Sequence, residues 1–233
     1  MSARRDGSHP IMRSPVAWGT LAFAVVLALV AIVRWHDNTW GAAVWLASFV
    51  AMLAIRMPHS IRNRQNVIVA ARRDLNERIL LSGMFLTMMV LPLLEIGTGL
   101  LTWADYQIPD YLTAIGAALQ LPALYMFWRA HADLGRNWSP GLEVREDHGL
   151  VNRGVYARVR HPMYAAIWLL ALTQPLLIHN WIAGVLVIPA FTAMWLLRVP
   201  REEALMRQTF GAAYDEYCRR TGRLWPKFTQ HAV

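Results

Sequence analysis

Long apolar runs separated by arginine-rich segments constrain this chain of 233 residues more than any other feature of its sequence. Several runs approach the ~20 residues that an α-helix needs to cross a bilayer, which is more than a soluble core helix requires. Eleven tryptophans agree with this interpretation, because an indole ring suits the boundary between hydrocarbon and water. The sequence therefore predicts an all-α, polytopic membrane protein with about six transmembrane helices, at residues 16–33, 40–55, 79–101, 111–128, 162–178 and 181–197.

The distribution of basic residues predicts the orientation of these spans. Of the 23 Lys and Arg residues, only Arg34 falls on the opposite side of a six-span arrangement from the rest. Basic loops are retained in the cytoplasm, so we expect both termini and the active site to be cytoplasmic, in the inner membrane of a bacterium. This arrangement accounts for the net charge of +8 without a nucleic-acid partner. The first run lacks a convincing cleavage site, which favours an anchor over a signal peptide.

The connections between the runs carry further predictions. Only His179 and Asn180 separate the last two runs, so these should form a tight C-terminal helical hairpin. The linker at residues 56–78 is compatible with an amphipathic helix on the membrane surface or with a solvated connector. A helix is predicted at residues 201–220, in the cytoplasmic tail. We divide the chain into an N-terminal membrane region with four spans, residues 1–128, and a C-terminal region, residues 129–233.

The sequence Arg160-His161-Pro162-Met163-Tyr164 joins a polar, basic segment to an apolar run. Proline is tolerated in the first turn of a helix, and the residue before a proline avoids helical backbone angles. His161 is therefore predicted to be a non-helical cap, at a helix start whose free N–H groups attract anions. A polar site at a membrane edge suggests chemistry on a lipophilic molecule with a charged end.

Three polar segments resemble, in order and spacing, the motifs of the isoprenylcysteine carboxyl methyltransferase family. These are integral membrane enzymes that use S-adenosylmethionine, and the related phospholipid methyltransferases share their His-Pro and Glu-Glu signature. The segments are residues 134–139, residues 146–156 leading into the His-Pro cap, and Arg198 with Arg201-Glu202-Glu203. The resemblance covers residues 134–226, and the first three spans carry no recognisable signature.

The resemblance implies roles for individual residues. An S-adenosylmethionine site would be formed by His148, Leu150, Val151, Tyr156, His161, Pro162, Met163, Tyr164 and Glu202. Arg198 would hold the carboxylate of the methyl acceptor, and Trp138 is assigned to substrate binding. In the family, the C-terminal segment closes this site, and a tunnel opens sideways into the bilayer for the prenyl chain. Where eukaryotic members have a polar cofactor contact, this chain has Pro140-Gly141-Leu142-Glu143, so that contact is not carried over.

The residue types suit methyl transfer to a carboxylate. Alignment of donor and acceptor at ~3–3.5 Å can supply ~7–11 kcal/mol of the barrier to such a displacement. A carboxylate is already ionised at neutral pH, so no general base is needed. Arginine stays charged and can bind a carboxylate through two hydrogen bonds, which suits Arg198. From composition alone, an anchor at the membrane interface is the better explanation of Arg198, and only its spacing to Glu202 favours a functional role.

Other acceptors and other classes of protein stay open. A small thiol would need a base, whereas a phospholipid amine would be repelled by Arg198. A reductase of sterol-like lipids would need a nicotinamide cofactor. A transporter or scaffold should have polar groups near mid-membrane, where only Glu95 stands. His131 and Asp133 lack a third ligand for a metal. We expect a lipophilic or prenylated substrate and membrane lipid as partners, and infer no obligate protein partner.

Overall fold

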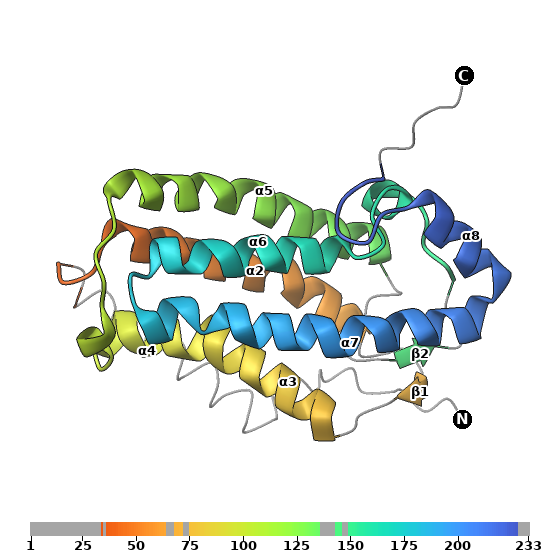
Figure 1. Ribbon diagram of the computed structural model, residues 1–233, viewed down its shortest axis with the longest axis horizontal. Coiled ribbons are helices and arrows are strands. Elements are labelled where there is room, and N and C mark those ends of the chain that lie inside the picture. The colour runs from red at the N-terminus through yellow and green to blue at the C-terminus, as the bar shows by residue number, and fades with distance from the viewer. Residues whose placement is uncertain are drawn as a thin grey trace, which may run out of the picture.

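The computed structural model describes residue 34 and residues 36–63, 68–71, 75–135, 143–145 and 149–227. Within these ranges the chain is almost entirely helical, and four long helices lie side by side (Figure 1). They are α2 (Trp40–Asn63), α5 (Asp110–Leu134), α6 (Pro162–Leu177) and α7 (Val187–Phe210). α5 packs against α6 and α2.

Three consecutive helical elements pack along one side of α7 and the turn before it. They are α3 (Leu75–Phe85), a π-helical turn η2 (Leu86–Val90) and α4 (Leu91–Thr98). α3 packs against α7, and a short 3₁₀ helix η3 (Thr102–Ala104) leads on to α5. α5 begins after Pro109, with Asp110 in its first turn, where a negative charge is favourable.

Four helical stretches are long and apolar enough to cross a membrane: Trp40–Ser60, Leu75–Thr98, Asp110–Leu134 and Trp181–Phe210. The prediction of an integral, multi-pass membrane protein is therefore confirmed. The predicted number of six spans is not confirmed. The helix α6 has only 16 residues, and residues 16–33 lie outside the described residues. A helix of that length rises about 24 Å, less than the ~30 Å hydrocarbon core. The start of α6 lies beside Glu202 and Glu203 of α7, before that helix ends at Phe210.

The predicted helical hairpin of α6 and α7 is present, and Asn180 fixes its connection. The Asn180 side chain accepts hydrogen bonds from the N–H groups of Ile182 and Ala183, at 2.9 and 2.8 Å. These bonds cap a π-helical turn, η6 (Trp181–Val185), that leads into α7. Asn180 also donates to the Leu101 carbonyl and to Asp105, at 2.6 and 2.7 Å. The hairpin is thereby tied to the segment before α5.

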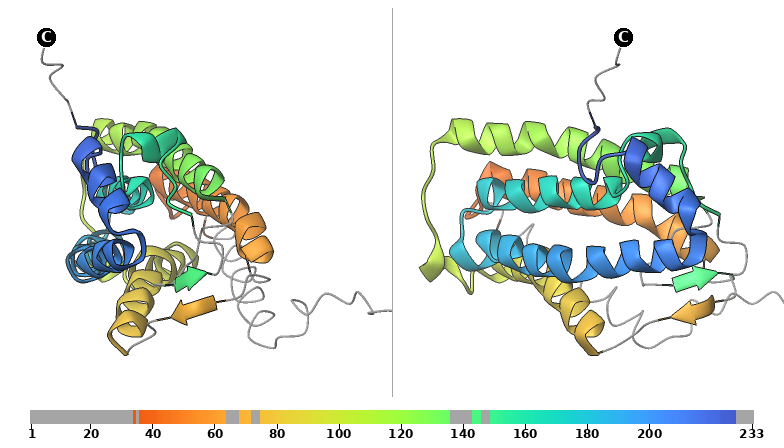
Figure 2. Two further views of the ribbon diagram at one scale, coloured as in Figure 1. Left: turned by 90° about the vertical axis from the view of Figure 1, so that its right-hand side faces the viewer. Right: turned by 45° about the vertical axis from the view of Figure 1, so that its right-hand side comes forward.

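The predicted linker and tail helix have different forms from those expected. α2 continues past residue 55 to Asn63, and α3 begins at Leu75. Both ends of the predicted linker, residues 56–63 and 75–78, are therefore helical. Between them, β1 (Ile68–Ala71) pairs antiparallel with β2 (Glu143–Arg145), which forms the one sheet in the described ranges and departs from the predicted all-α fold. This small sheet lies at the same end of the bundle as α8 (Ala212–Arg220; Figure 2). α7 continues through Pro200, and the chain turns only at Gly211, whose φ of 52° favours glycine.

Gln174 joins the two π-helical turns inside the bundle. Its Nε2 donates to the carbonyls of Thr87 and Ala183 at 2.9 and 2.8 Å, and its Oε1 accepts from the Trp45 indole at 3.3 Å. The side chain is only 1% exposed. Because π-helical turns disturb the regular backbone ladder, carbonyls there need such outside partners.

Replacing Gln174 by leucine is expected to lower the free energy of unfolding by about 2–4 kcal/mol, because buried polar groups lose their partners. Denaturant unfolding in detergent micelles measures the change. The control is Gln107→Leu, which makes the same chemical change at an exposed position in the segment before α5. Equal stability of the two variants would contradict this role for Gln174.

Glu95 lies at the end of the bundle opposite the start of α6. Its Oε2 accepts the N–H of Leu101 at 2.7 Å, and Arg34 donates to its backbone carbonyl at 3.1 Å. Glu95 therefore stabilises the loop that follows α4, three residues before that helix ends. This position at a helix end does not provide the mid-membrane polar group that a transporter should have.

Candidate active site

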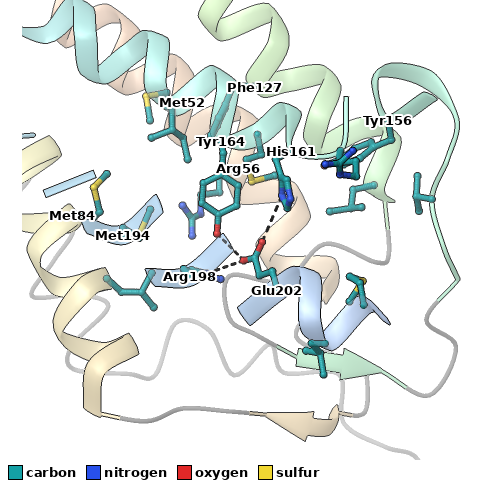
Figure 3. A pocket seen from close by; sticks show the side chains of 18 of the residues that line it. Met52, Arg56, Met84, Phe127, Tyr156, His161, Tyr164, Met194, Arg198 and Glu202 are labelled. Atoms are coloured by element: carbon teal, nitrogen blue, oxygen red, sulfur yellow. Dashed lines mark hydrogen bonds and ion pairs between the residues drawn. The ribbon is translucent and has the colours of Figure 1, made fainter. Parts of the chain in front are cut away.

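A cavity of about 630 Å³ occupies the end of the bundle where α6 begins (Figure 3). Its walls come from α2, α3, η2, α5, α6, α7 and α8 and from the segment before α6. One half is apolar and rich in methionine; it is lined by Met52, Leu53, Leu81, Met84, Phe85, Met88, Met89, Phe127 and Met194. The other half is polar and is lined by Arg56, Tyr156, Arg160, His161, Tyr164, Arg198, Glu202, Tyr214 and Tyr217. A single chamber can therefore take a ligand with a lipophilic part and a charged part.

The structure brings most of the predicted site residues to this cavity. Those that line it are Leu150, Val151, Tyr156, His161, Met163, Tyr164, Arg198 and Glu202. His161 has the non-helical backbone angles expected of a cap, φ −122° and ψ 58°, and Pro162 is the buried first residue of α6. Trp138 and His148 lie outside the described residues.

Glu202 is the centre of the polar half. It accepts hydrogen bonds from the Tyr164 hydroxyl at 2.7 Å and from Arg198 Nε at 2.8 Å, and His161 Nδ1 lies 3.9 Å away. These contacts join the first turn of α6 to the adjacent turns of α7. The Glu202 side chain is 21% exposed, so a ligand in the cavity can reach it. The other side of the Arg198 guanidinium faces Glu77 of α3, at 3.9 Å.

Glu203, the next residue, points away from Glu202 into a buried ionic cluster. Its carboxylate accepts from Arg223 Nε and Nη2 at 3.0 and 2.6 Å, from His161 Nε2 at 3.2 Å and from Arg160 Nε at 3.4 Å. The hydrogen bond to Glu203 raises the pKa of Arg223, so this guanidinium stays charged. Sequence analysis gave Glu203 no role, because a Glu-Glu pair does not reveal which carboxylate faces the cavity.

The segment after α8, residues 221–227, is bound to the start of α6 beside the cavity, and we call it the closing segment. Backbone N–H groups of Arg160 and His161 donate to the carbonyls of Gly222 and Arg223, at 2.8 and 3.0 Å. Tyr217 donates its hydroxyl to the Tyr156 carbonyl at 2.7 Å. Burial raises the pKa of both tyrosines, so both hydroxyls stay protonated donors at neutral pH. Because the His161 N–H is engaged, an anion at this helix start would have to bind later N–H groups.

Several cavity residues were not found by sequence analysis. Arg56 and the methionines of α2, α3 and η2 come from the N-terminal spans, which carry no recognisable motif. Glu77 was likewise missed, although it is only 4% exposed in a segment expected to be a linker. A charged residue at the end of an apolar run was the one available signal for Arg56. Among the described residues, no group of three or more His, Cys, Asp or Glu is placed to hold a metal ion.

The fold and the cavity define a class: a polytopic helical membrane protein with a half-apolar, half-charged chamber at one end of its bundle. Residues 115–208, which contain α6 and most of α7, match the model of the isoprenylcysteine carboxyl methyltransferase (ICMT) family. This match and the relatives below confirm the resemblance found in the sequence.

The curated relatives carry names that agree with the family model. The chain is 26% identical over 189 residues to "Probable protein-S-isoprenylcysteine O-methyltransferase" of Oryza sativa subsp. indica, covering 77% of this chain and 93% of that protein. It is 35% identical over 72 residues to protein-S-isoprenylcysteine O-methyltransferase of Schizosaccharomyces pombe, covering 31% and 30%. A solved structure of the eukaryotic intramembrane Ras methyltransferase ICMT is 21% identical with a TM-score of 0.44, covering 78% of this chain and 62% of that one.

Proposed function

We propose that this protein is a membrane methyltransferase that uses S-adenosylmethionine to methylate the carboxylate of a lipophilic, isoprenylcysteine-like acceptor. The observation that carries this proposal is the continuity of the two halves of the cavity. A methionine-rich apolar chamber runs directly into the charged group of His161, Tyr164, Arg198 and Glu202. The names of the curated relatives support the same reaction class.

The polar half suits the parts of S-adenosylmethionine, which carries an ammonium, a sulfonium, a carboxylate and an adenine. Glu202 is accessible and anionic, which suits the cationic groups. The tyrosines Tyr156 and Tyr164 offer ring faces to the adenine or the sulfonium. We assign cofactor binding to these residues together with His148, Leu150, Val151, His161, Pro162 and Met163. We assign the acceptor carboxylate to Arg198 and further substrate contacts to Trp138.

The reaction needs positioning rather than proton transfer. The cofactor supplies the methyl group, the acceptor carboxylate oxygen attacks the methyl carbon, and S-adenosylhomocysteine leaves. Within the protein, Arg198 would orient the carboxylate, and the closing segment would keep water out of the chamber. Holding the reacting atoms in line is the main source of rate in such a displacement.

The apolar half supports a lipophilic acceptor that enters from the bilayer. Leu53, Leu81 and Phe85 line the cavity and are 38%, 37% and 52% exposed, so the cavity is open beside α2 and α3. The apolar chamber therefore reaches the surface of α2 and α3 that membrane lipid would cover. Methionine side chains are flexible and polarizable, so they adapt to chains of different shape. A prenylated substrate and membrane lipid are accordingly the proposed partners.

The alternative acceptors fit the cavity less well. A thiol acceptor needs a base, and His161 is already held between Glu203 and Glu202. A phospholipid amine would meet Arg56 and Arg198, two cations that line the polar half. We propose that this half faces the cytoplasm, in a bacterial inner membrane, because Arg198, Arg201, Arg207 and the basic tail lie at its end of the bundle.

Calorimetric titration with S-adenosylhomocysteine, with NADPH as a parallel titrant, tests the proposed cofactor class. We expect S-adenosylhomocysteine alone to bind the detergent-purified protein, because Glu202 and the tyrosines offer partners for its ammonium and adenine. Binding of NADPH alone would favour the reductase. If neither ligand binds to a folded sample, the methyltransferase proposal is wrong.

A further inference from the structure

Arg198 is already surrounded by negative charge before any acceptor arrives. Its guanidinium contacts Glu202 at 2.8 Å and Glu77 at 3.9 Å, and both carboxylates come from helices packed around the cavity. An acceptor carboxylate bound only by Arg198 would be a third anion around one guanidinium in a space largely shielded from water. Such crowding of like charges is unfavourable at low dielectric.

A second guanidinium faces the same space. Arg56 lines the cavity from α2, and in Figure 3 its guanidinium points into the cavity toward the group of Tyr164, Arg198 and Glu202. The positive charges of Arg56 and Arg198 act on each other. Arginine is not deprotonated in proteins, so this repulsion persists at every working pH. An anion bound between two such cations is attracted by both and relieves their repulsion.

We propose that Arg56 determines acceptor specificity by binding the acceptor carboxylate together with Arg198. This inference rests on the proposed function and extends it to a residue of the N-terminal spans. Arg56 and Arg198 hold the carboxylate from opposite walls, and Glu77 competes with the acceptor for Arg198.

The test compares two ligands of the full-length protein saturated with S-adenosylhomocysteine, which cannot donate a methyl group. One ligand is N-acetyl-S-farnesylcysteine, and the other is its carboxamide, which lacks the negative charge. The wild type is expected to bind the carboxylate at least about tenfold more tightly, as charge-assisted hydrogen bonds would give. In Arg56→Gln this preference should disappear while the carboxamide affinity stays unchanged. Arg56→Lys should retain part of the preference.

Two further variants make the test specific. Arg129→Gln is the matched control, because Arg129 pairs with Asp133 at 2.9 Å and does not line the cavity; it should keep the full preference. Glu77→Gln removes the competing carboxylate and should strengthen carboxylate binding, a gain that a folding defect cannot produce.

Three other results would each overturn either the role of Arg56 or the proposed function. An unchanged preference in Arg56→Gln overturns the role of Arg56 and leaves the proposed function standing. An equal loss of affinity for both ligands in Arg56→Gln would mean that Arg56 has a structural role, which also overturns the inference. Failure of the folded wild type to bind S-adenosylhomocysteine refutes the proposed function itself.

Discussion

Replacing Arg198 by alanine is expected to lower kcat/KM for methyl transfer to a carboxylate acceptor by about two to three orders of magnitude. The Arg198 side chain is 9% exposed, lines the cavity and contacts the carboxylates of Glu202 and Glu77. Its removal leaves the acceptor carboxylate without its main partner and takes a cation away from the carboxylates of Glu77 and Glu202. Transfer of a radiolabelled methyl group to N-acetyl-S-farnesylcysteine measures the loss.

The matched control is Arg198→Lys, which keeps the positive charge but loses the planar fork of donors. It should recover part of the activity, because charge contributes to binding and geometry to alignment. Binding of S-adenosylhomocysteine to Arg198→Ala should weaken by less than about tenfold, because Tyr164 still holds Glu202 at 2.7 Å. Unchanged turnover in Arg198→Ala would remove this residue from the mechanism.

The sequence was sufficient to predict the helical membrane architecture, the hairpin and the polar end of the site. These features depend on local signals: the length of apolar runs, the two-residue connection at Asn180, and the effect of Pro162 on the residue before it. The predicted cap at His161 and its neighbours Met163 and Tyr164 all reached the cavity for this reason.

The parts that could not be predicted depend on contacts between distant segments. The apolar half of the cavity requires α2, α3 and η2 to pack near α7, and nothing in their local sequence specifies that neighbourhood. The orientation of Glu202 and Glu203 depends on the rotation of α7, because adjacent residues on a helix face different directions. The last apolar run was predicted to end at residue 197, yet α7 continues through Pro200 to Phe210. The division of the chain at residue 128 stays a prediction, since the cavity takes walls from both sides of it.

Glu203→Gln is expected to lower the free energy of unfolding by about 3 kcal/mol, because breaking a buried ionic cluster leaves its cations uncompensated. The carboxylate is 2% exposed and has Arg160, His161 and Arg223 around it. These partners hold the closing segment on the start of α6, where Arg160 also donates to the carbonyls of Cys218 and Thr221. The segment should therefore loosen before the bundle unfolds.

Limited proteolysis and denaturant unfolding together measure this effect: residues 221–227 should become cleavable in Glu203→Gln at denaturant concentrations that leave the wild type intact. The matched control is Glu216→Gln on α8, where the same chemical change breaks exposed ion pairs with Arg219 and Arg220. Such surface pairs contribute little, so this variant should behave as the wild type. Equal behaviour of the two variants would mean that the Glu203 cluster does not hold the closing segment. A loss of stability in Glu203→Gln alone would explain why a charged residue occupies a buried position beside the carboxylate that faces the cavity.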